Sequence, residues 1–296
     1  MPIPGRLAAV VCAVSLVCLV GCSSRTGGIS GFRSSATIAP PSEQDLSEVV
    51  SAARSTLGSR SAISVRLDSA AVFGGAPKPI GGGGLFDFGA SRGQVELSRP
   101  IGTERVIFFP ESVFVAQPQP GALLPAGKVW ISAGLTEQSL ATNFPQFVTQ
   151  VESLNPGLLL SEVEWGATSA APIGYGANAG SRQFSVSVDL TKAQSEAAGP
   201  SGDAFRRAIG YQLIEMSGTS VPTQITVDVE IDSGGKVVLL RSSPAGAGLG
   251  TVTVVLSQFG AKVNVGQPPR ATVADISSLA PGGERENAGG GDSDGA

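Results

Sequence analysis

One serine and one lysine have the spacing of a catalytic pair. Ser233 and Lys236 match S-x-x-K, in which a serine nucleophile is followed by a lysine base. That chemistry needs the serine at the start of a helix, whereas Asp-Ser-Gly-Gly-Lys between two alternating runs is typical of a β-hairpin turn. The chain contains no histidine, so no Ser-His or Cys-His pair can form. We therefore expect no catalytic residue and no enzyme.

Two groups of carboxylates could bind a metal ion or share a proton. Asp228, Glu230 and Asp232 alternate along a predicted strand, as ligands of a hard metal ion could. Their neighbours Val227, Val229 and Ile231 mark the other face as the buried one, so we expect the three acids to face water. Glu162 and Glu164 could act as paired carboxylates, but their place in a short predicted helix favours an ordinary helix surface. We expect neither a metal site nor a cofactor.

The N-terminal residues predict export and attachment of a lipid. Arg6 is followed by an uncharged apolar run over 7–20, which is the pattern of a secretory signal. The run is shorter than the ~20 apolar residues of a membrane-spanning helix. Leu19-Val20-Gly21-Cys22 resembles the lipobox of bacterial lipoproteins, whose cysteine is acylated on sulfur. We predict that residues 1–21 are a signal peptide and that acyl chains on Cys22 anchor the protein at the extracytoplasmic face of the cell membrane.

The remaining chain is predicted to form one folded domain between two segments of low complexity. Residues 22–41 are rich in Ser, Gly and Pro and predict a flexible tether, and the acidic, Gly-rich residues 281–296 predict a disordered tail. Residues 42–280 form the domain, and the 40 glycines and 20 prolines of the chain favour many turns and short strands. With 20 basic and 24 acidic residues and no basic run, nucleic acid is excluded as a partner.

Apolar and polar residues alternate in many short runs, which is typical of an antiparallel sheet with one covered face. One helix is predicted from the N-cap Ser42 to Gly58. Residues 73–89, which include GGAPKPIGGGG, predict a mobile insertion between strands. Further helices are predicted near 143–154, 161–165 and 203–216. Strands are predicted near 63–67, 94–97, 104–109, 112–116, 128–132, 184–190, 225–231, 236–241, 251–256 and 262–265.

One predicted strand pair is apolar on both faces. In the first strand, Val106 and Phe108 lie on one face and Ile107 and Phe109 on the other. A curved sheet with too few helices to cover it can leave an apolar pocket suited to acyl chains. A fully packed core is the alternative. The predicted lining residues are Val106, Phe108, Val113, Val115, Val129 and Ile131.

The second half of the chain resembles the LolA-like superfamily, and within it the actinobacterial envelope lipoproteins of the LppX and LprG type. The segments that carry the resemblance are FSVSVDL (184–190), ITVDVEIDSGGKVVLLR (225–241), TVTVVLSQFGAKVNVGQPP (251–269) and VADI (273–276). The resemblance spans residues 43–276. It implies an α+β fold in which a strongly curved antiparallel sheet, a half-barrel of roughly 9–11 strands, packs on a few helices.

The same resemblance implies a hydrophobic cavity for acylated lipids or lipoglycans and supplies no catalytic residues. We therefore expect a membrane-anchored envelope lipoprotein that binds or transports a lipid or an acylated glycolipid. The sequence leaves two alternatives open. The first is a tethered protein-interaction or regulatory module of the cell envelope with a filled core. The second is an extracytoplasmic hydrolase, which would need a convergent polar site among residues such as Glu162, Glu164 or Ser233.

Overall fold

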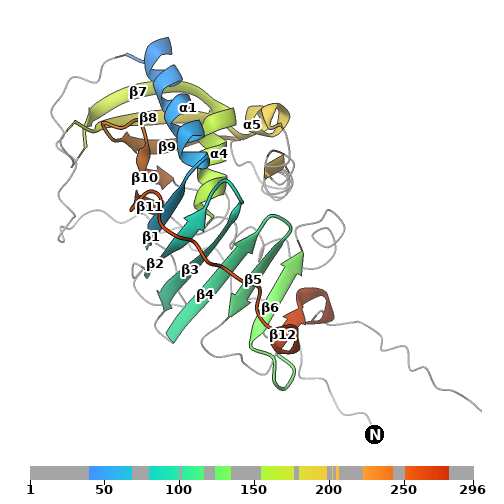
Figure 1. Ribbon diagram of the computed structural model, residues 1–296. Coiled ribbons are helices and arrows are strands. Elements are labelled where there is room, and N and C mark those ends of the chain that lie inside the picture. Colours follow the sequence, from blue (N-terminus) through green and yellow to red (C-terminus); the bar gives the residue numbers. More distant parts are fainter. Residues whose placement is uncertain are drawn as a thin grey trace, which may run out of the picture.

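Twelve strands form one curved sheet in the computed structural model (Figure 1). The model describes residues 40–68, 80–99, 102–116, 124–134, 155–176, 180–198, 202, 205–206, 223–242 and 251–279. Three α-helices have described bounds and lie against one half of this sheet. The predicted α+β half-barrel is therefore confirmed. The predicted helix at 143–154 lies outside the described residues, as does most of the one at 203–216.

Each helix begins at a residue whose side chain caps it. Ser42 is the N-cap of the first helix, as predicted, and its Oγ accepts a hydrogen bond from the Asp45 backbone N–H at 3.1 Å. Asn155 caps the second helix in the same way, because its Oδ1 accepts from the Gly157 N–H at 3.0 Å. Asp189 caps the third. The helices are α1 (Glu43–Leu57), α4 (Pro156–Gly166) and α5 (Leu190–Glu196).

The sheet has the strand order β12-β6-β5-β4-β3-β2-β1-β11-β10-β9-β8-β7. All neighbouring strands are antiparallel except β12 and β6, which are parallel. The expectation of a purely antiparallel sheet is therefore wrong at this one edge. The strands are β1 (Arg60–Asp68), β2 (Ile80–Asp87), β3 (Arg92–Arg99), β4 (Gly102–Phe109), β5 (Ser112–Ala116), β6 (Trp130–Gly134), β7 (Ala167–Tyr175), β8 (Arg182–Asp189), β9 (Gln224–Ile231), β10 (Val237–Ser242), β11 (Thr251–Ser257) and β12 (Val273–Asp275).

Strand β2 contains the glycine run that predicted a mobile insertion. That prediction is wrong for residues 80–87, which pair with β1 and with β3. A Cβ atom on Gly82 would lie 2.2 Å from the Glu96 carbonyl oxygen, and one on Gly84 would lie 1.8 Å from that of Gln94. Only glycine allows the β2 and β3 backbones to approach this closely. Because glycine has no side chain, the run shows no alternation of apolar and polar residues, and the sequence pattern does not predict a strand there.

The inner face of the sheet is the face that shares one core with the helices. Helices α1, α4 and α5 contact mainly β7 to β10. An ion pair ties α1 to this half, because Arg182 Nη2 lies 2.8 Å from Asp45 Oδ1. In the other half, the alternating apolar residues of β3 to β6 point to the same inner face and are buried in the same core. The inner face is thus continuously apolar across both halves.

The outer face carries a second, smaller apolar cluster. Ile107 on β4 and Phe114 on β5 pack there against Val263 and Val265. Those two valines belong to residues 261–269, here called the crossing segment, which runs over the sheet from β11 to β12 (Figure 1). The crossing segment is extended but belongs to no strand, so the strand predicted at 262–265 is wrong. It explains why the outer face of β4 is apolar, since the crossing segment covers that face.

Candidate functional site

Five of the six predicted lining residues meet on the inner face of β4, β5 and β6. Four of them, Val106, Phe108, Val113 and Val115, are buried in the main core, and Ile131 packs against it. Val129 does not join them, because 43% of its surface is exposed. It precedes β6, and its backbone N–H donates to the Thr272 carbonyl oxygen at 2.9 Å. That this face lines a ligand cavity stays a prediction.

Three aromatic rings extend the inner face to the start of α4. The ring of Phe86 lies 5.0 Å from that of Phe88 and 5.9 Å from that of Phe108, measured between centroids. A Cβ atom on Gly157, in the first turn of α4, would lie 3.4 Å from Phe86 Cε1. The α4 N-terminus therefore meets the rings of Phe86 and Phe88. The sequence pattern missed Phe86 because it follows the glycine run.

Glu162 places a carboxyl group inside the protein. Only 3% of this residue is exposed, and its Oε2 atom has no hydrogen-bond partner in the structure. Burial removes water from the carboxylate and raises the pKa of Glu162 to about 8. The carboxyl group is therefore largely protonated at neutral pH. The expected helix surface is wrong for Glu162. Only 11% of the Glu164 side chain is exposed as well, but its Oε1 lies 2.8 Å from Nε of Arg54, whose side chain is exposed.

The acids of β9 do not gather into a metal site. Glu230 is buried and accepts hydrogen bonds from Ser181 Oγ at 2.7 Å and Gln183 Nε2 at 3.1 Å, so the water-facing expectation is wrong for it. Asp232 instead holds the hairpin turn, since its Oδ1 accepts two backbone N–H bonds. Among the described residues, no group of three His, Cys, Asp or Glu side chains could hold a metal ion.

Asp228 is only half-buried. Burial raises the pKa of its carboxyl group, while the positive charge of Arg241 and a hydrogen bond from Ser185 act in the opposite direction. The Asp228 carboxyl group thus interacts with Ser185 on β8 and Arg241 on β10, and it shares no site with Glu230 and Asp232.

Ser233 and Lys236 occupy the β9–β10 hairpin turn, as expected. The Asp232 N–H donates to the Lys236 carbonyl oxygen at 2.9 Å across that turn, and Ser233 is exposed. The Lys236 ammonium group binds Ser55 at the end of α1, with Nζ 2.8 Å from Oγ. The Lys236 side chain thus binds the end of α1. Ser233 lies in a turn and not at the start of a helix, where an S-x-x-K nucleophile would have to be.

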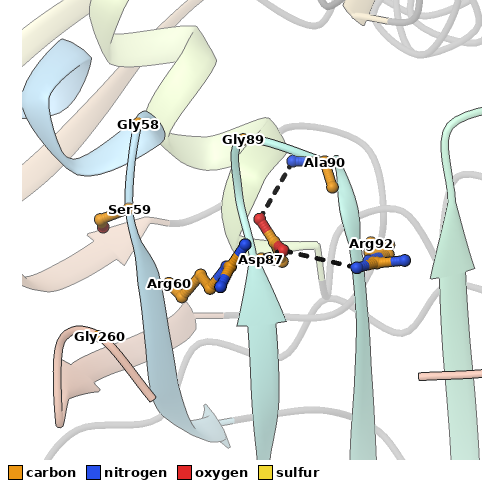
Figure 2. A pocket seen from close by; sticks show the side chains of 8 residues that line it. All are labelled: Gly58, Ser59, Arg60, Asp87, Gly89, Ala90, Arg92 and Gly260. Carbon is orange, nitrogen blue, oxygen red and sulfur yellow. Dashed lines mark hydrogen bonds and ion pairs between the residues drawn. The ribbon is translucent and has the colours of Figure 1, made fainter. Parts of the chain in front are cut away.

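A polar hollow of about 600 Å³ lies at the rim of the sheet, where α1 ends and β1 begins. Arg60, Asp87 and Arg92 line it together with glycines, and Figure 2 shows the carboxylate between the two arginines. The sequence pattern gave no signal for this group, because Arg60 lies 27 positions before Asp87 and the strand register brings the three side chains together.

The predicted lipidation site, Cys22, lies outside the described residues. No helix in the described part of the chain combines the length and the apolar character needed to cross a membrane.

Comparisons with known proteins give structural matches only. No family model matches the chain, and no curated protein is significantly similar to it. The crystal structure of LprF from Mycobacterium bovis is 13% identical, with a TM-score of 0.40, and the match covers 78% of this chain and 99% of LprF. A LolA superfamily protein from Nitrosomonas europaea is 7% identical, with a TM-score of 0.31, and the match covers 77% of this chain and 96% of that protein.

At these identities and TM-scores, neither match says what this chain binds. The half-barrel fold itself follows from the strand order and the helix placement described above.

Proposed function

We propose that the protein is a lipid-anchored envelope lipoprotein that binds or carries a lipid or lipidated glycoconjugate against its inner face, without catalysis. One observation supports this function best. The inner face of β3 to β6 is apolar over four neighbouring strands, while the described helices pack mainly on β7 to β10. A broad, concave and apolar sheet surface is chemically suited to acyl chains.

The proposed location of the protein in the cell rests on its N-terminal sequence motif. The Leu-Val-Gly-Cys motif at 19–22 would place the diacylglyceryl group on Cys22, and residues 22–41 would connect it to α1. Two or three acyl chains on one cysteine are enough for stable membrane attachment. The domain would then stand at the extracytoplasmic face of the cell membrane, where its ligand would be a membrane lipid or an acylated glycolipid.

The second candidate is a tethered protein-interaction or regulatory module with a filled core. It is favoured by the burial of Val106 and Val113, neither of which has any exposed surface. Side chains that line an open cavity usually keep some accessible surface, whereas those of a filled core do not. The two candidates therefore differ in whether the purified protein contains lipid.

The test is the recovery of lipid from protein that has no anchor. The Cys22→Ser chain is purified from an actinobacterial host, its organic extract is examined by mass spectrometry, and the lipid is quantified per protein molecule. We expect about one bound lipid molecule per chain. Absence of a stoichiometric lipid, together with no binding of a fluorescent fatty acid, would reject lipid binding in favour of the filled-core module.

A pair of variants locates the lipid. Ala133 is buried on the inner face of β6, so Ala133→Phe adds a ring to that face and should lower the lipid content at least severalfold. Val129→Phe adds the same ring at the exposed position just before β6 and should leave the lipid content unchanged. Circular dichroism of both variants checks that they are folded. Equal lipid content in both folded variants would place the lipid elsewhere.

A further inference from the structure

Three charged side chains stand side by side on neighbouring strands at the rim of the outer face. The register places Arg60 on β1 directly opposite Asp87 on β2, and Asp87 directly opposite Arg92 on β3. Directly opposed residues of antiparallel strands share a face of the sheet. Leu85, two residues before Asp87, belongs to the outer cluster, so this row lies on the outer face. It is therefore separate from the inner face of the proposed lipid site.

The aspartate at the centre of the row is held in place. Its Oδ2 atom lies 2.9 Å from Arg60 Nε and 3.8 Å from Arg92 Nη2, and its Oδ1 accepts a hydrogen bond from the Ala90 N–H at 3.2 Å. Asp87 is buried, whereas the side chains of Arg60 and Arg92 are 56% and 42% exposed. The carboxylate thus fixes the position of two guanidinium groups that still reach solvent (Figure 2).

The row has one more positive charge than negative and has spare hydrogen-bond donors. A guanidinium group has five N–H donors, and Arg60 uses only Nε on Asp87. Arg92 contacts Asp87 only at 3.8 Å, and its buried Nε has no hydrogen-bond partner in the structure. A buried donor without a partner is costly, which makes it a marker for a group that binds there.

The space beside the row has room for such a group. The hollow of about 600 Å³ is bordered by Gly58 after α1, Gly89 in the β2–β3 turn and Gly260 after β11. These glycines place no side chain between the arginines and solvent. Figure 2 shows the hollow framed by three backbone turns, with both guanidinium groups beside the carboxylate.

We propose that this hollow binds a phosphate group, either free or in the headgroup of an anionic lipid. Arginine is suited to phosphate because its planar donors pair with two oxygens at once. A phosphate has enough acceptor oxygens to bind both guanidinium groups, and its charge compensates the extra positive charge of the row. Asp87 acts as a positioning residue that orients the arginines and touches no phosphate.

The experiment uses the mature chain (residues 22–296) with Cys22→Ser, so that no acyl anchor contributes. Inorganic phosphate is titrated by calorimetry at low salt. In parallel, the protein is sedimented with phosphatidylcholine vesicles that contain or lack phosphatidylinositol. We expect saturable binding in at least one arm and a loss of about tenfold or more in affinity for R60Q/R92Q. Binding of phosphate alone identifies a free ion as the ligand, whereas binding only to phosphatidylinositol vesicles identifies a headgroup.

Arg105→Gln is the matched control. Arg105 also lies on the outer face and pairs with a carboxylate, since its Nη2 is 2.6 Å from Glu96 Oε1, but it does not line the hollow. R105Q should bind each probe within about twofold of the unmodified chain. If R60Q/R92Q is destabilised, R92Q alone is used, because Arg92 makes only the longer contact. No saturable binding in either arm, or an equal loss in R105Q, would overturn the proposal. Neither result would affect the lipid content on the inner face.

Discussion

Phe86 on β2 covers the position where a side chain on residue 93 of β3 would stand. The two residues are directly opposite each other, and a Cβ atom on Gly93 would lie 2.1 Å from Phe86 Cδ2. The ring therefore packs on bare backbone, and glycine is required at 93 for the aromatic cluster of Phe86, Phe88 and Phe108 to form.

Gly93→Ala should destabilise the fold by about 2 kcal/mol, because the added methyl group forces the Phe86 ring out of its place. Urea unfolding followed by circular dichroism gives the change. Gly81→Ala is the control, since no atom lies within 4 Å of a Cβ there, and it should change the stability by less than about 0.5 kcal/mol. A Gly93→Ala chain as stable as Gly81→Ala would show that the ring does not lie over residue 93.

Glu162 should make the protein less stable as the pH rises. Its folded pKa of about 8 lies above the ordinary glutamate pKa of 4.5, so between these values the folded state holds a proton that the unfolded state has lost. The associated stability is fully present below pH 4.5 and is lost as the pH rises through 8. In this window, the loss of stability approaches about 1.4 kcal/mol per pH unit.

Glu162→Gln removes this titration and should flatten the pH dependence. Thermal unfolding at pH values across that window compares the two chains, and the variant should be the more stable one at the alkaline end. Glu164→Gln, two residues away on the same helix, loses an ion pair whose arginine partner, Arg54, is exposed, and it should keep the slope of the unmodified chain. An unchanged slope in Glu162→Gln would mean that its carboxyl group is ionised in the folded protein.

The crossing segment should contribute measurably to stability. Val263 and Val265 are buried against Ile107 and Phe114, so Val263→Ser with Val265→Ser should cost about 2 kcal/mol or more. Urea unfolding gives the cost, and limited proteolysis should cut the variant first within residues 261–269. Asn264→Ser lies between the two valines with its side chain exposed, and it should have no effect on either measurement. Equal resistance of all three chains to protease would contradict the proposed packing.

Alternation predicted the strands that have one buried face and one polar face. Strands β8 and β9 follow their patterns almost to the residue, and the Asp-Ser-Gly-Gly turn joins β9 to β10 as expected. Helix α1 was also predicted from local signals. Its N-cap Ser42 and its C-cap Gly58 mark the two ends of a segment with one apolar stripe. In these elements, local chemistry and tertiary packing favour the same structure.

The alternation of apolar and polar residues failed to predict elements whose structure depends mainly on tertiary packing. Strand β7 consists mostly of Ala, Ser, Pro and Gly, which have low strand propensity, and its place beside β8 and under α1 makes it a strand. Residues 262–265 alternate because their valines pack on the outer face, without any strand partner. Glu230 was expected to face water because its apolar neighbours on β9 mark the other face as buried, and Glu162 because of its place in a short helix. Both are buried, because parts of the chain distant in sequence cover them.

The pairing of β1 with β11 constrains when the protein can fold. Ser61 Oγ donates to the Ser257 carbonyl oxygen at 2.7 Å, and these residues are 196 positions apart. This β1–β11 pairing joins the two halves of the sheet. Contacts this distant in sequence make folding slow and leave sheet edges open until the chain is nearly complete. The two halves of this sheet can therefore join only after β11, one of the last strands in the chain, has been synthesised.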